Sequence, residues 1–163
     1  MFSYKIAMSA LTPQTIRILQ KYTACDISDC LLELKVPKAG YLSDLTNYCN
    51  APLSSITDNP RQIITAPACT VQFIPRSDNA GDYGQSNIEK GRHWVDLVRK
   101  DCIVVENQPS GQTNAVCGGI MALRMKVLGV KGIVVYGRIR DVDELEETEL
   151  MVSSELLAFS FPP

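Results

Sequence analysis

Three consecutive segments determine the architecture: CIVV at residues 102–105, GGIMALRMKVLG at 118–129 and GIVVYGRIRD at 132–141. The first segment and the start of the third are continuous apolar runs rich in β-branched residues, which is typical of strands buried on both faces. The middle segment has the apolar periodicity of a helix, opened by Gly118-Gly119 and closed by Gly129. Strand, helix and strand in this order predict a βαβ crossover.

The loops that follow the two predicted strands should meet. Parallel strands of a crossover end at the same edge of a sheet, so Gly118-Gly119 is expected beside the segment 137–141. The glycines would let an anion approach the unpaired N–H groups at the start of the helix. One of the two arginines of that segment can grip a carboxylate or enolate oxygen, and Asp141 offers hard oxygen atoms for Mg²⁺ or Mn²⁺. The pattern predicts a site for a 2-keto acid chelated to a divalent metal.

Each part of this pattern also has a purely structural interpretation. A Gly-Gly pair is common in tight turns. Asp141 followed by Glu144 fits a helix-capping signature, with an acid at the N-cap and a second acid three residues later. Asp143, Glu146 and Glu147 fit a solvated acidic helix face. The conjunction favours a site, because an Arg-Asp pair stands at the carboxyl end of the second strand with a complete crossover before it.

The sequence before residue 102 carries weaker signals of secondary structure. Thr12 and Pro13 indicate the start of a short amphipathic helix, and residues 26–29 can cap a second helix at 30–34. Residues 41–60 indicate a loop with at most one short element, whereas 62–65 and 68–74 indicate strands. Residues 76–91 form a polar loop, either a lid or an ordinary surface loop, before a predicted helix at 92–99. No linker indicates a domain boundary, so the sequence predicts one domain over residues 1–163.

Composition excludes several functional classes. The 163 residues are 45% hydrophobic and 21% charged, which is the profile of a soluble globular domain. A net charge of -2 without a basic and aromatic run excludes the usual footprint of nucleic-acid binding. The six cysteines lack CxxC spacing, and any histidine-dependent chemistry would have to rest on His93. The sequence shows neither a secretory signal nor a membrane span, so we expect a cytoplasmic protein.

The same residues carry a family resemblance. The segments 118–122, 128–132 and 137–141 resemble the RraA-like family, which includes 4-hydroxy-4-methyl-2-oxoglutarate aldolases and the regulator of ribonuclease E activity A. The family signature is a glycine, twenty residues, Arg-Asp, two residues and an acid, and Gly119, Arg140, Asp141 and Glu144 satisfy it. Weaker similarity extends to residues 26–31, 66–71 and 93–96.

The resemblance implies a fold and an activity. It implies an α/β domain of the swivelling β/β/α type, with a mixed sheet, assembled as a homotrimer or hexamer with sites between subunits. It implies a metal-dependent, class II aldolase: a carbon–carbon lyase that cleaves 4-hydroxy-2-keto dicarboxylic acids and decarboxylates oxaloacetate to pyruvate. The alternatives are a non-catalytic protein-binding regulator resembling the ribonuclease E inhibitor, and a remnant that keeps the fold without activity.

The resemblance also assigns roles within the site. Asp141 would hold Mg²⁺ or Mn²⁺, directly or through water, with help from Glu144. Arg140 would stabilise the enolate. The backbone amides of Ile120 and Met121, next to Gly118 and Gly119, would bind the substrate carboxylate.

Three departures from the family pattern bear on these roles. Gly119 replaces an extra acid of the best-known aldolase subtype, so the metal would depend more on Glu144. Tyr136 stands where many relatives have aspartate. The sequence after the signature does not resemble the further strands with which relatives complete their sheet.

Overall fold

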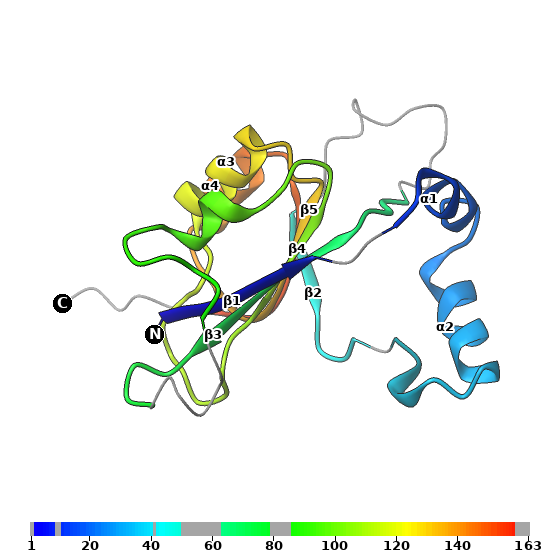
Figure 1. Cartoon of the computed structure of the whole chain (residues 1–163), viewed down its shortest axis with the longest axis horizontal. Coiled ribbons are helices and arrows are strands. Elements are labelled where there is room, and N and C mark those ends of the chain that lie inside the picture. The colour runs from blue at the N-terminus through cyan, green and yellow to red at the C-terminus, as the bar shows by residue number, and fades with distance from the viewer. Residues whose placement is uncertain (1, 9–10, 41, 50–62, 79–85, 159–163) are drawn as a thin grey trace.

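The computed structural model describes residues 2–8, 11–40, 42–49, 63–78 and 86–158. A six-stranded sheet with the order β1-β3-β4-β5-β6-β2 forms its centre (Figure 1). The four inner strands are parallel, and each edge strand is antiparallel to its neighbour. The predicted α/β fold with a mixed sheet is confirmed. The strands are β1 (Phe2–Met8), β2 (Thr46–Cys49), β3 (Ala68–Ile74), β4 (Ile103–Asn107), β5 (Gly132–Ile139) and β6 (Met151–Leu157).

The helices lie in two places. α3 (Gly119–Val127) and α4 (Val142–Glu147) lie side by side against the sheet, whereas α1 (Pro13–Leu19) and α2 (Ala24–Glu33) form an arm beyond one end of the strands (Figure 1). The described residues also form two short 3-10 helices, η1 (Pro37–Gly40) and η4 (Trp94–Leu97). No helix in these described ranges is long and apolar enough to cross a membrane.

The predicted crossover is confirmed as β4, α3 and β5. Alternate residues of the parallel strands point to the face that carries α3 and α4, where Val104 and Val135 are fully buried. From the helices, Ala122, Met125 and Leu145 complete this apolar layer with no exposed surface. Burial of this layer is the main force that fixes both helices against the sheet.

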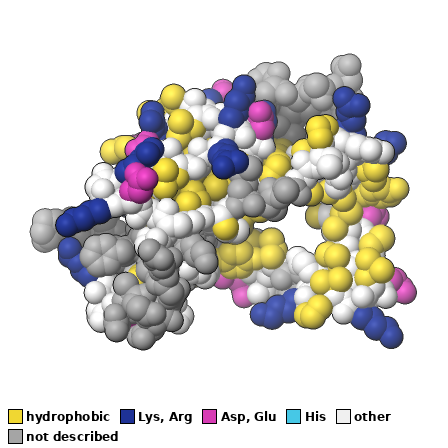
Figure 2. Space-filling model, viewed as in Figure 1, with side chains coloured by type: hydrophobic (Ala, Val, Ile, Leu, Met, Phe, Trp, Pro, Cys, Tyr) yellow, Lys and Arg dark blue, Asp and Glu magenta, His cyan; other side chains and the backbone are white. Residues whose placement is uncertain are grey.

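The arm has no comparable core. Neither α1 nor α2 contains a buried residue, and apolar side chains gather on its surface (Figure 2). Local capping nevertheless defines both helices. Thr12 accepts a hydrogen bond from the Thr15 amide at 3.1 Å, which confirms the predicted start of α1. Thr23 and Asp26 form a capping box, so α2 begins at Ala24, earlier than predicted.

Other predicted boundaries also differ. Residues 63–65 are irregular and position 62 lies outside the described residues, so the predicted strand at 62–65 was wrong where the structure describes it. The predicted helix at 92–99 is only the 3-10 turn η4. The residues after α4 form the inner strand β6, so the sequence end does contribute a further strand. Residues 79–85 lie outside the described part, so the lid stays a prediction.

Candidate functional site

A cleft of about 450 Å³ opens at the carboxyl ends of β4 and β5. One wall is the loop between β4 and α3, the floor is the start of α3, and the other wall is the end of β5. The lining consists of residues 113–118, Ile120, Met121, Arg140, Asp141 and Ala158. Most of the predicted site residues therefore share one cleft. Gly119 and Glu144 lie outside its lining.

The two glycines allow the loops to approach closely. Gly118 is the N-cap of α3 in an extended conformation, and a Cβ atom there would lie 2.7 Å from Asp141 Oδ2. A Cβ atom on the buried Gly119 would lie 2.5 Å from Glu144 Cβ. Both distances are shorter than van der Waals contact. A larger residue at position 119 would push the start of α3 away from α4, whereas one at position 118 would displace the Arg140 and Asp141 side chains.

Asp141 has an unusual backbone conformation. Its φ of 58° and ψ of 49° place it in the left-handed region, which aspartate tolerates better than most residues. α4 starts at Val142, as the capping signature predicts, but the Asp141 side chain makes no capping hydrogen bond. Its Oδ2 lies instead 3.3 Å from Arg140 Nε. This turn directs the carboxylate into the cleft beside the guanidinium.

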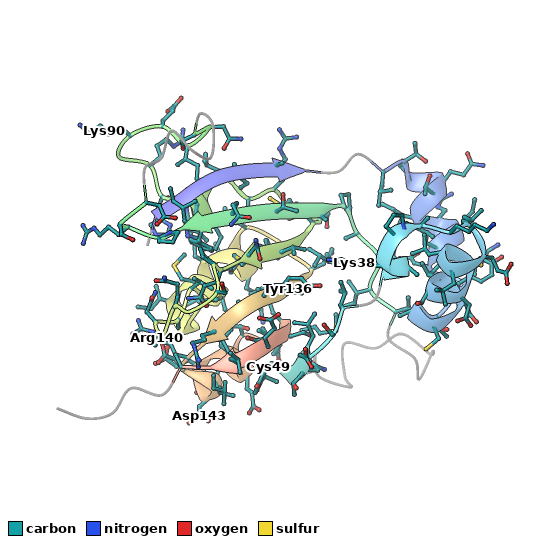
Figure 3. The ribbon with its side chains drawn as sticks, turned by 90° about the horizontal axis from the view of Figure 1, so that it is seen from below. Lys38, Cys49, Lys90, Tyr136, Arg140 and Asp143 are labelled. Atoms are coloured by element: carbon teal, nitrogen blue, oxygen red, sulfur yellow. The ribbon has the colours of Figure 1, made fainter. Side chains whose placement is uncertain are left out.

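The structure distinguishes the two arginines that the residue pattern left equivalent. Arg138 is half-buried and donates from Nε to Gln112 O at 3.2 Å and from Nη1 to Leu157 O at 2.8 Å. The Arg140 side chain is 64% exposed and lines the cleft. Arg140 is thus the cation available to a ligand. Figure 3 shows it at the end of the sheet opposite the arm.

The acidic residues at the cleft fit a metal ion that is bound mainly by water and by substrate oxygens. In the part of the chain that the structure describes, no three His, Cys, Asp or Glu side chains converge on a metal position. Asp141 is the carboxylate in the cleft lining, and Glu144 packs against Gly119 one helical turn away. Mg²⁺ commonly keeps several waters and takes one or two carboxylates plus substrate oxygens. The Asp141 carboxylate fits such a shared site.

A buried acid lies behind the cleft floor. Glu106 is completely buried, and neither carboxylate oxygen has a hydrogen-bond partner of good geometry among the described residues. Burial raises its pKa to about 8, an increase that the neighbouring Cys117 thiol partly offsets. Burial and then the Glu106 carboxylate raise the pKa of Cys117 well above its usual value. Sequence reasoning missed Glu106, although an acid directly after the apolar run 103–105 was the available signal.

The other residues that the sequence singled out lie outside the cleft lining. His93 accepts a hydrogen bond from the Val95 amide at 3.3 Å and caps η4, away from the cleft lining. Asp143, Glu146 and Glu147 are exposed on α4, as a solvated acidic face would be. Tyr136 lies on the opposite face of the sheet from Val135, half-buried beside Asn107.

Solved structures share this fold. Streptomyces coelicolor RraAS2, described as an unusual member of the RNase ES inhibitor RraA protein family, has 22% identity and a TM-score of 0.68, over 92% of this chain and 66% of its own. An uncharacterized protein from Pseudomonas syringae has 18% identity and a TM-score of 0.67, over 93% and 62%. The chain thus spans less than two thirds of the length of either structure, and such identities show the fold alone.

Sequence comparison then identifies the family. No curated protein matches the sequence closely enough to count as a relative. The family model described as Aldolase/RraA, however, matches residues 24–159, which include every element of the cleft. The chain therefore belongs to the RraA-like family.

Proposed function

We propose that the protein is a divalent-metal-dependent carbon–carbon lyase that acts on small 2-keto acids. It would cleave 4-hydroxy-2-keto dicarboxylic acids, such as 4-hydroxy-4-methyl-2-oxoglutarate, and decarboxylate oxaloacetate to pyruvate. The observation that carries the proposal is the Arg140–Asp141 pair, which lines one cleft together with the start of α3. A family description that includes aldolases supports it.

The cleft offers the groups that these two reactions share. Both reactions leave negative charge on the enolate of pyruvate. The first N–H groups of α3, at Ile120 and Met121, would bind the substrate carboxylate, because they lack partners within the helix. The Arg140 guanidinium would lie beside the oxygen on which the enolate charge develops, where a fixed cation lowers the barrier most.

Asp141 would hold Mg²⁺ or Mn²⁺, directly or through water, with help from Glu144. A bound divalent cation supplies Lewis-acid polarisation of the keto group. The left-handed backbone of Asp141 and the missing side chain of Gly118 fix where the carboxylate points. These two features explain why a glycine at position 118 faces an acid at position 141.

We further propose that the active form is a homotrimer or hexamer in the cytoplasm. Ile120, Leu123 and Val127 lie one helical turn apart on α3, with 78%, 56% and 70% of their surface exposed. Ile120 also lines the cleft, so a second copy that covered this stripe would border the site. Association would remove the apolar stripe from water.

A non-catalytic protein-binding regulator is the second candidate. The exposed apolar residues of α3 and of the arm favour it, because such surfaces bind proteins. A pure binding module would not require the carboxylate of Asp141, however. The two candidates therefore differ in their response to loss of that one group.

The direct test follows pyruvate release from oxaloacetate and from 4-hydroxy-4-methyl-2-oxoglutarate, first with Mg²⁺ and then with a chelator. Asp141→Asn is the informative variant, because asparagine also tolerates the left-handed conformation and removes only the charge. Asp143→Asn is the matched control on the exposed face of α4. We expect activity that requires metal, falls at least about a hundredfold in Asp141→Asn, and persists in Asp143→Asn. No pyruvate from either substrate would exclude the lyase.

A further inference from the structure

We propose that Gln108 and Arg138 are positioning residues of the cleft: they fasten the loop that forms one wall to the strand that carries Arg140. The proposal rests on the proposed function for its kinetic consequence, but its structural part stands independently. We call residues 109–116 the wall loop. It connects β4 to the start of α3, and its last four residues line the cleft.

Gln108 joins the strand to the wall loop through its side chain. It is 8% exposed and follows the last residue of β4. Its Oε1 accepts a hydrogen bond from the Arg138 amide at 2.8 Å, and its Nε2 donates to Asn114 O at 2.7 Å. Its own amide donates to Tyr136 O at 2.8 Å. Both ends of the side-chain amide are therefore used, one on β5 and one on the wall loop.

The backbone of β5 is shaped to receive this side chain. The pairing of β5 with β6 shifts register between Val135 and Arg138. On the β4 side of β5, the Arg138 amide faces Gln108, as the Tyr136 carbonyl does two residues earlier. Gly137 stands in this bulge with a φ of 145°, and a Cβ atom there would lie 2.5 Å from Gln108 Cβ. Only glycine leaves room for the glutamine at this point.

Arg138 extends the connection to two further segments. Its Nε donates to Gln112 O in the wall loop at 3.2 Å, and its Nη1 donates to Leu157 O at the end of β6 at 2.8 Å. Its carbonyl accepts a hydrogen bond from the Val116 amide at 2.9 Å. One residue thus holds the middle and the end of the wall loop, together with the strand that precedes Ala158 in the cleft lining.

These contacts determine the shape of the cleft without facing a ligand. Arg140 lies two residues after Arg138, and its amide donates to Cys117 O at 3.1 Å, just beyond the wall loop. A displaced wall loop would therefore change the distance between Thr113 or Asn114 and the Arg140 guanidinium. Loss of Gln108 or Arg138 would leave partly buried carbonyl or amide groups without partners, which favours such a displacement.

The experiment compares Gln108→Met and Arg138→Met with Arg140→Met, and uses Arg92→Met as a control that removes an exposed cation. Hydrogen exchange of the amides at 113–117 reports the wall loop directly. We expect it to accelerate about tenfold in both positioning variants, the change expected for one or two lost hydrogen bonds. KM for oxaloacetate should rise by a similar factor with kcat nearly unchanged. Arg140→Met should instead lower kcat and leave exchange unchanged.

Arg138→Lys keeps a hydrogen-bond donor and should restore part of the protection of the amides at 113–117 against exchange. It also serves as the second variant if Arg138→Met does not fold. Unchanged exchange and unchanged KM in both positioning variants would overturn the proposal. A loss of kcat equal to that of Arg140→Met at constant KM would overturn it too, because Arg138 would then act on the reacting atoms. If the wild-type protein makes no pyruvate, the proposed function fails, and the exchange measurement alone still decides the positioning role.

Discussion

The crossover places two acids in opposite environments: Asp141 lines the cleft beside Arg140, whereas Glu106 is buried beneath the helices. The Arg140–Asp141 pair is partly exposed and faces the cleft, so its charges are available to a ligand. Glu106 lies in the same crossover but is completely buried without hydrogen-bond partners among the residues described. Burial of a carboxylate disfavours its charged form, so this residue is neutral in the folded protein at neutral pH.

Glu106→Gln should change how stability depends on pH. The folded pKa of about 8 is above the value of 4.5 expected for an exposed glutamate, so the folded protein keeps a proton that the unfolded chain releases. The free energy of unfolding should therefore fall as pH rises from about 4.5 to 8 and level off above that range. The Glu106→Gln variant should not show this fall. Over the same pH range, its free energy of unfolding should rise relative to that of the wild type by on the order of 5 kcal/mol.

Urea unfolding at pH 5 and pH 8.5 measures this difference. Glu147→Gln, which removes an exposed acid from α4, is the matched control and should follow the wild type. If the wild type and Glu106→Gln lose the same stability between the two pH values, Glu106 is not the titrating group.

At the scale of elements, the α3–α4 contact depends on two glycines with different neighbours. A Cβ atom at position 119 would meet the Glu144 side chain, including its Cβ at 2.5 Å, next to the helix backbone. A Cβ atom at position 118 would meet mainly the outer atoms of Arg140 and Asp141, which can rotate away. The first substitution strains the packing of two helices, whereas the second disturbs the site.

Gly119→Ala should therefore destabilise the protein by about 1–3 kcal/mol, the usual cost of overpacking. Gly118→Ala should cost less stability and more activity, because it moves Arg140 and Asp141. Thermal melting and pyruvate release from oxaloacetate separate the two effects. Equal losses of stability in both variants, with equal residual activity, would contradict this assignment.

The crossover was predictable because its signals are local. Apolar runs, a helical period and closing glycines define β4, α3 and β5 without reference to distant residues. The different environments of Arg138 and Arg140 were not predictable, since residues two apart lie on the same face of a regular strand. Arg138 lies within β5 and contacts Leu157 on β6, whereas β5 ends at Ile139, so Arg140 lies in the turn before α4. The edge strands β1 and β2 depend on pairing with remote segments, which the pattern does not reveal.

At the scale of the whole molecule, the apolar stripe on α3 predicts association. Leu123→Glu or Val127→Glu should shift the native mass from three or six times the 18.0 kDa chain to the monomer, because a charge would be buried in the interface. Leu32→Glu, on the arm and 62% exposed, is the control for a charge placed elsewhere. Native mass spectrometry gives the answer. A wild-type monomer, or dissociation by Leu32→Glu alone, would contradict the proposed interface.

The central claim is that Arg140 and Asp141 hold a keto acid and a divalent metal in one cleft. Titration calorimetry of oxalate, a planar dianion that resembles the pyruvate enolate, tests this claim without requiring turnover. We predict that oxalate binds in the presence of Mn²⁺, and that its affinity falls at least about tenfold when Mn²⁺ is removed or when Asp141 is changed to asparagine. Equal affinity with and without Mn²⁺, or no binding under either condition, would contradict the claim.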